Sequence, residues 1–356
     1  EAEREGRLHV VIAAPEQLAA HFSIARPSAM HIDHAALAAV PPAARDLARM
    51  IERLAAEQLD MQRFAPRMRA NLRDNLEALA HATSLSRWRD AAKGRPGFVL
   101  AAGPSARAAL PWLGDARKLG PLIAVDTALP LCRGTGLPID CLVSVDPHPT
   151  SSVHLQEGCD GVGVLATQPF CTPAIVSSFA QRVLALPAGD KLCDRGAAEL
   201  DLPSLPVAGT VLLYALQIAA LLGCDPIFVA GADFAYVDGL SHARGTATSK
   251  PAPRTGLVVP DRRGRMVPSS SSLVRFKGDV EQHIAASTSR HVVVDGGGAA
   301  IAGVRTIDPA TIERWVQRAT RHADSFSLCA PPEPDELQIA RQLRTWRRLL
   351  AEFDAT

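Results

Sequence analysis

Residues 97–107 read GFVLAAGPSAR, an apolar run that stops at a Gly-Pro-Ser turn and continues into helix-forming residues. An unbroken apolar run is typical of a strand that is covered on both faces. Gly103 lets the backbone approach a neighbour closely, Pro104 suits the first position of a helix, and Ser105 places a hydroxyl beside the N–H groups of the helix start. The stretch therefore predicts a buried strand that turns directly into a helix. The turn has two interpretations: a phosphate site, or simple punctuation between the two elements.

Two alanines distinguish this turn from common nucleotide motifs. Ala101 and Ala106 stand where the dinucleotide fingerprint G-x-G-x-x-G has glycines, and the lysine of a P-loop is missing. The methyl group of Ala101 occupies space where close backbone approach is wanted. The turn is therefore neither a standard dinucleotide site nor a P-loop.

Similar apolar runs recur along the chain and alternate with helical patterns. With the strand at 97–102, the sequence predicts strands at 122–126, 141–146, 163–167, 182–187, 226–233 and 291–296, and helices at 106–112 and 211–222. Strands that alternate with helices favour an α/β fold of the Rossmann-like type, with a mostly parallel, open sheet.

The sequence on either side of this pattern is mainly helical. Residues 8–14 predict a strand that is followed by a helix, residues 41–88 predict a helical region, and residues 308–353 return to helical composition. Residues 247–272 are rich in Pro, Ser, Gly and Arg and predict a long, lid-like loop.

We therefore expect three regions along the chain. They are an N-terminal strand and helix region (1–93), a Rossmann-like catalytic domain (94–307) and a C-terminal helical segment (308–356). The cluster Lys93-Gly94-Arg95-Pro96 breaks the helical pattern and marks the first boundary.

Composition limits the partners and the compartment. The 356 residues are 47% hydrophobic, and 38 basic side chains against 37 acidic ones give a net charge of +1. That balance provides no overall field for a nucleic acid or an anionic membrane surface, so we expect neither as a partner, and no membrane insertion. Seven cysteines without a CxxC pair, and no secretory signal pattern at the start, favour a reducing, cytoplasmic setting.

Polar residues follow the predicted strands at the point where each strand ends. In a parallel sheet these positions share one edge, which is where ligands bind. Asp126 stands where such folds hold a ribose hydroxyl. The candidate donor-binding residues are Gly103, Pro104, Ser105, Asp126, Thr127, Asp146, Pro147, His148, Thr167 and Gln168.

The segment 226–246 adds candidate catalytic side chains after its strand. Asp233 and His242 are both able to take a proton, and Tyr236 lies between them in the sequence. The alternative is that Asp233 caps a turn and His242 is an ordinary surface residue. Asp146 and His148 make an incomplete ligand set for a metal, and none is predicted.

The order of these motifs resembles the motility accessory factor family, whose domain of unknown function is shared with archaeal 6-hydroxymethylpterin diphosphokinase-like proteins. The resemblance spans about residues 90–310. It rests on Gly103-Pro104-Ser105, on IAVDTALPLCRGTGLPIDCLVSVDP (123–147), on the segment 209–246 and on DGGGAAIAGV (295–304). The segment RANLRDNLEAL (69–79) is similar to the asparagine-containing helix that precedes this domain in bacterial members.

This resemblance implies a cytoplasmic, sialyltransferase-like glycosyltransferase of the bacterial flagellum. It would transfer a nonulosonic acid (sialic, pseudaminic or legionaminic) from a CMP-activated donor to Ser or Thr of flagellin, without a cofactor. The Gly-Pro-Ser turn would meet the donor phosphate or ribose, and Asp126 and Asp146 would line the nucleotide side. Asp233, Tyr236 and His242 would lie toward the sugar and the acceptor, with either Asp233 or His242 as the base.

Two rival functions remain open. A pterin diphosphokinase would bind ATP with Mg²⁺, and Asp126 and Asp146 would hold the metal only if their strands are neighbours. A non-enzymatic protein would instead bind flagellin through its helical flanks. The basic residues Arg254, Arg262, Arg263 and Arg265 either close over the donor carboxylate or dock the acceptor, or belong to a solvated loop. The oligomeric state is left open.

Overall fold

The structure is a computed structural model that describes residues 39–41, 45–206, 209–252 and 256–354. The chain divides into two compact units, Glu1–Arg67 and Met68–Thr356. In the first unit the described part is mainly the start of helix α3 (Arg45–Ala80). The strand and helix predicted from residue 8 onward lie outside the described residues.

The second unit contains a nine-stranded sheet in the order β1-β6-β5-β4-β3-β2-β9-β12-β13. All of its pairings are parallel, which confirms the predicted open, Rossmann-like sheet. The strands are β1 (Thr83–Ser84), β2 (Gly97–Leu100), β3 (Leu122–Val125), β4 (Ile139–Val143), β5 (Val162–Thr167), β6 (Arg182–Leu184), β9 (Ile227–Ala230), β12 (His291–Val294) and β13 (Arg305–Ile307).

The central strands are buried because helices cover both faces of the sheet. Phe98 on β2 lies edge-on to Trp112 of α4, with ring centroids 6.3 Å apart, and stacks on Phe228 of β9, which meets Trp315 of α10. Gly97 points the other way, against Ala219 of α8. This alternation explains why β2 reads as a continuous apolar run.

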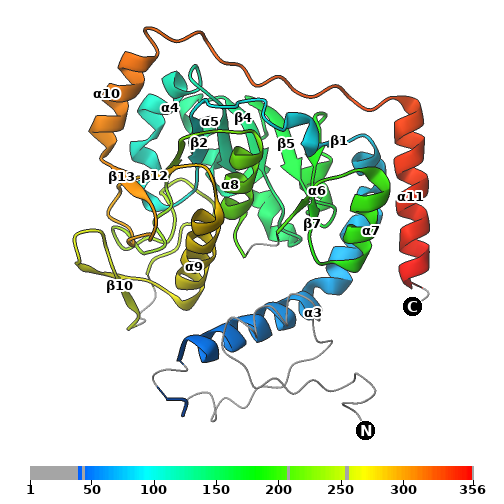
Figure 1. Ribbon diagram of the computed structural model, residues 1–356, viewed down its shortest axis with the longest axis horizontal. Coiled ribbons are helices and arrows are strands. Elements are labelled where there is room, and N and C mark those ends of the chain that lie inside the picture. The colour runs from blue at the N-terminus through cyan, green and yellow to red at the C-terminus, as the bar shows by residue number, and fades with distance from the viewer. Residues whose placement is uncertain (1–38, 42–44, 207–208, 253–255, 355–356) are drawn as a thin grey trace. The chain divides into compact units, whose positions relative to one another are not determined.

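Helices and 3₁₀ turns connect the strands (Figure 1). The 3₁₀ turns are η2 (Leu85–Trp88), η3 (Pro104–Ala108), η4 (Asp126–Ala128) and η5 (Pro149–Leu155). The helices of this unit besides α3 are α4 (Leu110–Ala116), α5 (Leu129–Thr135), α6 (Pro173–Val176), α7 (Lys191–Leu200), α8 (Val211–Leu221), α9 (Ser271–Ala286), α10 (Pro309–Ala319) and α11 (Glu336–Asp354). None of the described helices is long and apolar enough to cross a membrane.

The segment 247–272 differs from the predicted long loop. Within it, β10 (Val258–Pro260) and β11 (Met266–Pro268) form an antiparallel hairpin, and α9 begins at Ser271. Asp261 closes the hairpin by accepting hydrogen bonds from the backbone N–H groups of Arg263 and Arg265. The strands are short and rich in polar and Pro residues, which is why their composition reads as loop.

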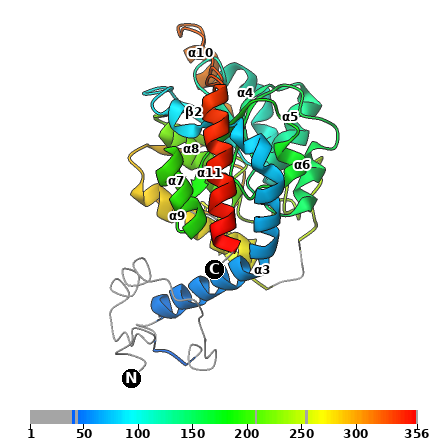
Figure 2. The same cartoon turned by 90° about the vertical axis from the view of Figure 1, so that its right-hand side faces the viewer.

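A second hydrophobic cluster lies where α11 packs against α7 and the C-terminal part of α3 (Figure 2). Trp346 of α11 is fully buried there, and Gly196 of α7 leaves the space that its ring occupies. The small parallel pair β7 (Leu186–Pro187) and β8 (Ser204–Leu205) borders this cluster. The predicted strand 182–187 thus divides between β6 and β7.

Candidate functional site

The order of the sheet reverses between β2 and β9, and the loops after these two strands meet there. Such a reversal is the usual ligand site of an open α/β sheet. Here the loops are bound to each other instead. The Ser105 backbone N–H donates to Asp233 Oδ2 at 2.8 Å, and the Ser105 hydroxyl donates to Asp233 Oδ1 at 2.6 Å. The protein's own carboxylate therefore occupies the place that a phosphate would take at this turn.

Glycines make this close approach possible. A Cβ on Gly103 would collide with the Gly231 carbonyl and the Asp233 carboxylate, and a Cβ on Gly296 would collide with the Ser105 side chain. Gly298 packs directly on Asp233, whose carbonyl accepts a hydrogen bond from Ala299 N–H at 2.7 Å. The DGGG segment after β12 thus closes the crevice from a third side.

The close approach that the turn needs is provided by β9 and not by β2. A Cβ on Gly231 would lie 2.5 Å from the Ala101 carbonyl oxygen and 2.9 Å from the Ala106 Cβ. The backbone of Gly231 also adopts a φ of +75°. Ala101 and Ala106 are therefore accommodated because a glycine faces them.

Burial dominates the acidity of Asp233. Desolvation raises its pKa to about 6 although two hydrogen bonds from Ser105 favour the ionised form, and the nearby charge of Asp295 raises it further. Both carboxylate oxygens are engaged by Ser105. Asp233 thus has the acidity of a general base but spends its oxygens on the junction between the two loops.

A second group of polar side chains lies on the neighbouring strands, at the carboxyl ends of β3 and β4. Asp126 is buried and accepts hydrogen bonds from Thr127 N–H (2.7 Å), from the Thr127 hydroxyl (3.2 Å) and from the Ser144 hydroxyl (2.6 Å). Burial raises the pKa of Asp126, while these bonds and the nearby His154 lower it. His154 from η5 faces Thr127, with Nε2 3.5 Å from the hydroxyl oxygen.

The strands of Asp126 and Asp146 are direct neighbours in the sheet, since Val125 of β3 pairs with Val143 of β4. Asp146 Oδ1 accepts from His148 N–H at 2.8 Å, and His148 in turn caps η5 by accepting from Thr150 N–H. Among the residues that the structure describes, no three His, Cys, Asp or Glu side chains gather as metal ligands.

The loop after β5 is braced internally. The Gln168 amide donates to the Val145 carbonyl at 2.7 Å and accepts from the buried Tyr214 hydroxyl of α8 at 3.1 Å. Thr167 lies at the end of β5 and is buried beside it. Gln168 therefore joins the loops after β4 and β5 to α8.

Two asparagines of α3 fasten the same loops from outside. The Asn71 amide donates to the carbonyls of Pro147 and Phe170, both at 2.9 Å. The Asn75 amide donates to the carbonyls of Pro169 (3.1 Å) and Cys171 (2.8 Å). Since Asn71 and Asn75 are four residues apart on one helix face, a single helix fixes the backbone on both sides of the site.

The segment 238–252 after β9 lies over this edge of the sheet, and we call it the flap. It is held by Ala243 N–H, which donates to the Ala102 carbonyl at 2.9 Å, and by Arg107, which donates to the Arg244 carbonyl. His242 lies on the flap, and Ser241 Oγ is 3.0 Å from its Nδ1. Burial and the positive charges of His154 and Lys250 lower its pKa.

The predicted catalytic residues therefore separate into different environments. Asp233 lies in the Ser105 junction, His242 faces His154 beside the Asp126 group, and Tyr236 is tied by its backbone N–H to the Pro268 carbonyl of β11.

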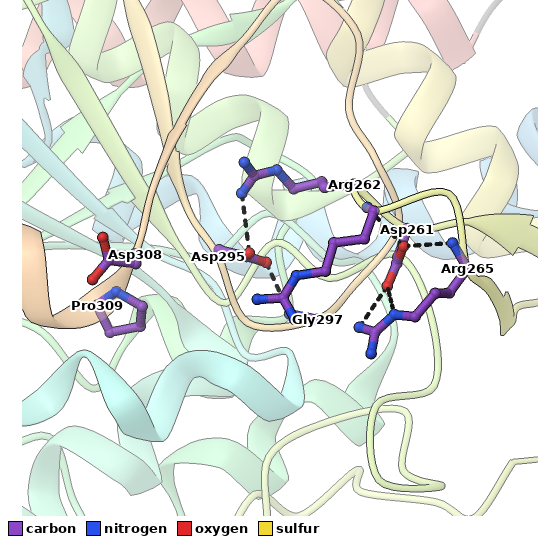
Figure 3. Close-up of a pocket in the computed structure, with 8 residues that line it drawn as sticks. Asp261, Arg262, Arg265, Asp295, Gly297, Asp308 and Pro309 are labelled. Carbon is purple, nitrogen blue, oxygen red and sulfur yellow. Dashed lines mark hydrogen bonds and ion pairs between the residues drawn. The ribbon is translucent and has the colours of Figure 1, made fainter.

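The basic residues of the hairpin line a separate cavity of about 290 Å³ (Figure 3). Arg265 is paired with Asp261 at 2.6 Å, and Arg262 with Asp295 at 3.3 Å. Arg263 also borders this cavity. Arg254 lies outside the described residues.

Comparison with known proteins matches the second unit to a family. Residues 68–239 match the family model described as "6-hydroxymethylpterin diphosphokinase MptE-like". The chain carries an MptE-like domain. This confirms the resemblance inferred from the sequence motifs, and the matched segment contains the Ser105 junction and the Asp126 group but not the DGGG segment.

One solved structure with a similar fold is a MAf glycosyltransferase from Magnetospirillum magneticum AMB-1. The TM-score is 0.52 at 12% sequence identity, over 83% of this chain and 45% of that chain. This likeness shows a shared fold, and the chain spans less than half the length of that protein. No curated protein sequence matches the chain significantly.

Sequence reasoning missed several residues of the MptE-like domain that build this edge. His154 and Ser144 carry no motif, because a lone His in a short turn and a Ser after a strand occur everywhere. Asn71 and Asn75 were visible only as part of a similar helix. Their spacing of four residues is the signal that could have placed both amides on one face.

Proposed function

We propose that this protein is a glycosyltransferase that transfers a nonulosonic acid from a CMP-activated donor to Ser or Thr of flagellin. The observation that carries the proposal is the buried polar group around Asp126 at the carboxyl ends of β3 and β4, fastened by α3 and covered by the flap. The similar fold of a MAf glycosyltransferase and the ordered motifs of the sequence support the reaction class.

The donor nucleotide is assigned to the β3–β5 half of the edge, because the switch point itself is filled. Asp126, Thr127, Asp146, Pro147, His148, Thr167 and Gln168 line this half in the proposal, and the turn Gly103-Pro104-Ser105 forms its wall. A carboxylate has about four lone-pair positions, so Asp126 keeps one for a ribose hydroxyl after accepting three hydrogen bonds.

The chemistry needs positioning and charge stabilisation more than activation, because CMP is already a good leaving group. Lys250 and His242 on the flap are the cationic and proton-donating side chains that face this edge, and they are proposed to meet the leaving phosphate. Asp233 then acts by holding the Ser105 turn against the DGGG segment, since both of its oxygens are engaged. Tyr236 is proposed to border the acceptor.

Ligand-induced stabilisation tests the donor site. A ligand that binds only the folded state raises the melting temperature, by an amount that grows with its concentration relative to Kd. We expect CMP and CMP-linked nonulosonic acids to raise it in the presence of EDTA. Asp146→Ala is expected to weaken the shift strongly, and Asp160→Ala, which changes an aspartate outside the proposed site, is expected to leave it unchanged.

A second candidate is an ATP-dependent pterin diphosphokinase-like enzyme. The description of the matching family favours it, and so does the adjacency of β3 and β4, which brings Asp126 and Asp146 to neighbouring strand ends. A stabilisation by ATP that requires Mg²⁺, with none by CMP compounds, would favour this candidate. Stabilisation by flagellin alone, with neither nucleotide, would favour a non-enzymatic binding role.

A further inference from the structure

His154 is the buried side chain that the proposed function has not used. It is 4% exposed and projects from η5 toward the strand ends of β3 and β4. Its Nε2 faces Thr127, and its charge influences both Asp126 and His242. His154 therefore lies between the buried carboxylate and the flap.

One nitrogen of this ring lacks a partner. Nδ1 of His154 is fully buried and makes no hydrogen bond to any residue that the structure describes. A buried polar atom without a partner costs about 1–3 kcal/mol. Native proteins tolerate such a cost mainly where a ligand or a water molecule completes the site.

The hydrogen bonds on the other side of the ring determine its tautomer. The Thr127 hydroxyl donates its proton to Asp126 Oδ1, so only a lone pair of the hydroxyl oxygen is left to face His154. Nε2 must then carry the ring proton in order to donate to Thr127. Nδ1 is left as the lone-pair nitrogen, which is the form that accepts a proton.

We propose that Nδ1 of His154 accepts the proton of the acceptor hydroxyl, while Thr127 and Asp126 hold the imidazole in the tautomer protonated on Nε2. This inference rests on the proposed transferase function. The hydroxyl oxygen forms a bond to the anomeric carbon of the donor as the bond from that carbon to the phosphate oxygen breaks. The electron pair of the broken bond leaves with CMP, and the proton on Nδ1 passes to water after the product departs.

The groups around His154 are suited to this step. η4 contributes Asp126, the flap contributes His242, α5 contributes Cys132 and Arg133, and α6 has no titratable side chain. Arg133 is bound to the Gly158 carbonyl and to Glu157. An anionic Asp126 behind Thr127 stabilises the imidazolium that forms during the transfer.

Histidine tautomers are readable without activity. In protein labelled with ¹⁵N-histidine, with His154 assigned by its absence in His154→Gln, we expect the signals of a ring protonated on Nε2 and unprotonated on Nδ1. A proton on Nδ1 at neutral pH would overturn the proposal, because that nitrogen would then have no lone pair to offer.

Kinetics supply the second test. Gln at 154 keeps an N–H near the position of Nε2 and removes Nδ1, so we expect His154→Gln to bind CMP with unchanged affinity and to lose 10²–10⁴-fold in kcat. The acidic limb of its profile of kcat against pH should also disappear. The control, His322→Gln, changes an exposed histidine after α10 and should keep the kcat of the wild type.

The outcomes separate the inference from the function on which it rests. A wild-type protein that binds no CMP and releases none from the donor defeats both. An active wild type together with a His154→Gln variant that keeps kcat within threefold defeats the role of His154 alone. If His154→Gln fails to fold, Thr127→Val removes the link to Asp126 at similar volume and should lower kcat at least tenfold, and an unchanged kcat would contradict the proposal.

Discussion

At the scale of single residues, Asp233 couples stability to pH. Its folded-state pKa of about 6 lies above the ordinary value of 3.8, so the unfolded chain ionises first as pH rises. Folding free energy is therefore lost between pH 3.8 and 6, by about 3 kcal/mol. Asp233→Asn keeps hydrogen bonds to Ser105 without ionising, so its stability relative to the wild type should rise by that amount from pH 4 to pH 7, measured by urea unfolding.

His291 of β12 works in the opposite direction, so the wild type alone does not reveal the effect. Burial and His283 lower the pKa of His291 to about 4, and stability is lost as pH falls from 6.5 toward 4. The two groups oppose each other over the same pH range. A difference between Asp233→Asn and the wild type that stays constant with pH would contradict the assignment to Asp233.

Gly103 offers a second test at this scale. Ala at 103 places its Cβ against the Gly231 carbonyl and the Asp233 carboxylate, so the junction of the two loops must open. We expect Gly103→Ala to destabilise the protein by more than 2 kcal/mol. Gly278→Ala, in open space on α9, should stabilise it by about 0.5–1 kcal/mol. Equal effects in calorimetry would show that the junction is not tight.

At the scale of elements, α3 holds the loops of the site. Asn75→Ala leaves the carbonyls of Pro169 and Cys171 unpaired in a buried position, which costs about 1–3 kcal/mol. The variant should also bind CMP more weakly, because the loop after β5 is released. Asp74→Ala on the exposed side of α3 should change stability by less than about 0.5 kcal/mol. Unaltered CMP affinity in Asn75→Ala, with its stability reduced, would place the loop outside the donor site.

The strands were predictable because burial on both faces leaves a direct signal, as in the runs that form β2 and β9. The hairpin β10–β11 was not, because it is held by backbone bonds to Asp261 and has little apolar sequence of its own. The candidate site was half predictable. Asp126 and Ser105 follow strands and could be named, but the partner of Ser105 comes from a strand more than a hundred residues away.

At the scale of the whole second unit, the C-terminal helix completes a hydrophobic cluster. Trp346 is fully buried beside Gly196, so Trp346→Ala should cost about 3–5 kcal/mol. Leu337→Ala on the same helix changes a side chain that is 81% exposed and should cost less than about 0.5 kcal/mol. The ion pairs that α11 makes with α7 are exposed and add little. Equal denaturation midpoints for the two variants would mean that α11 is not part of the folded core.

The central claim is that this fold transfers a sugar from a CMP-linked donor, and ³¹P NMR follows that reaction directly. With a CMP-linked nonulosonic acid, flagellin and EDTA, the claim predicts that the phosphodiester signal of the donor is replaced by the monophosphate signal of CMP. The conversion should slow at least a hundredfold in His154→Gln. An unchanged donor signal, together with conversion of ATP to AMP when Mg²⁺ and a hydroxymethylpterin are supplied, would contradict the claim and identify a diphosphokinase.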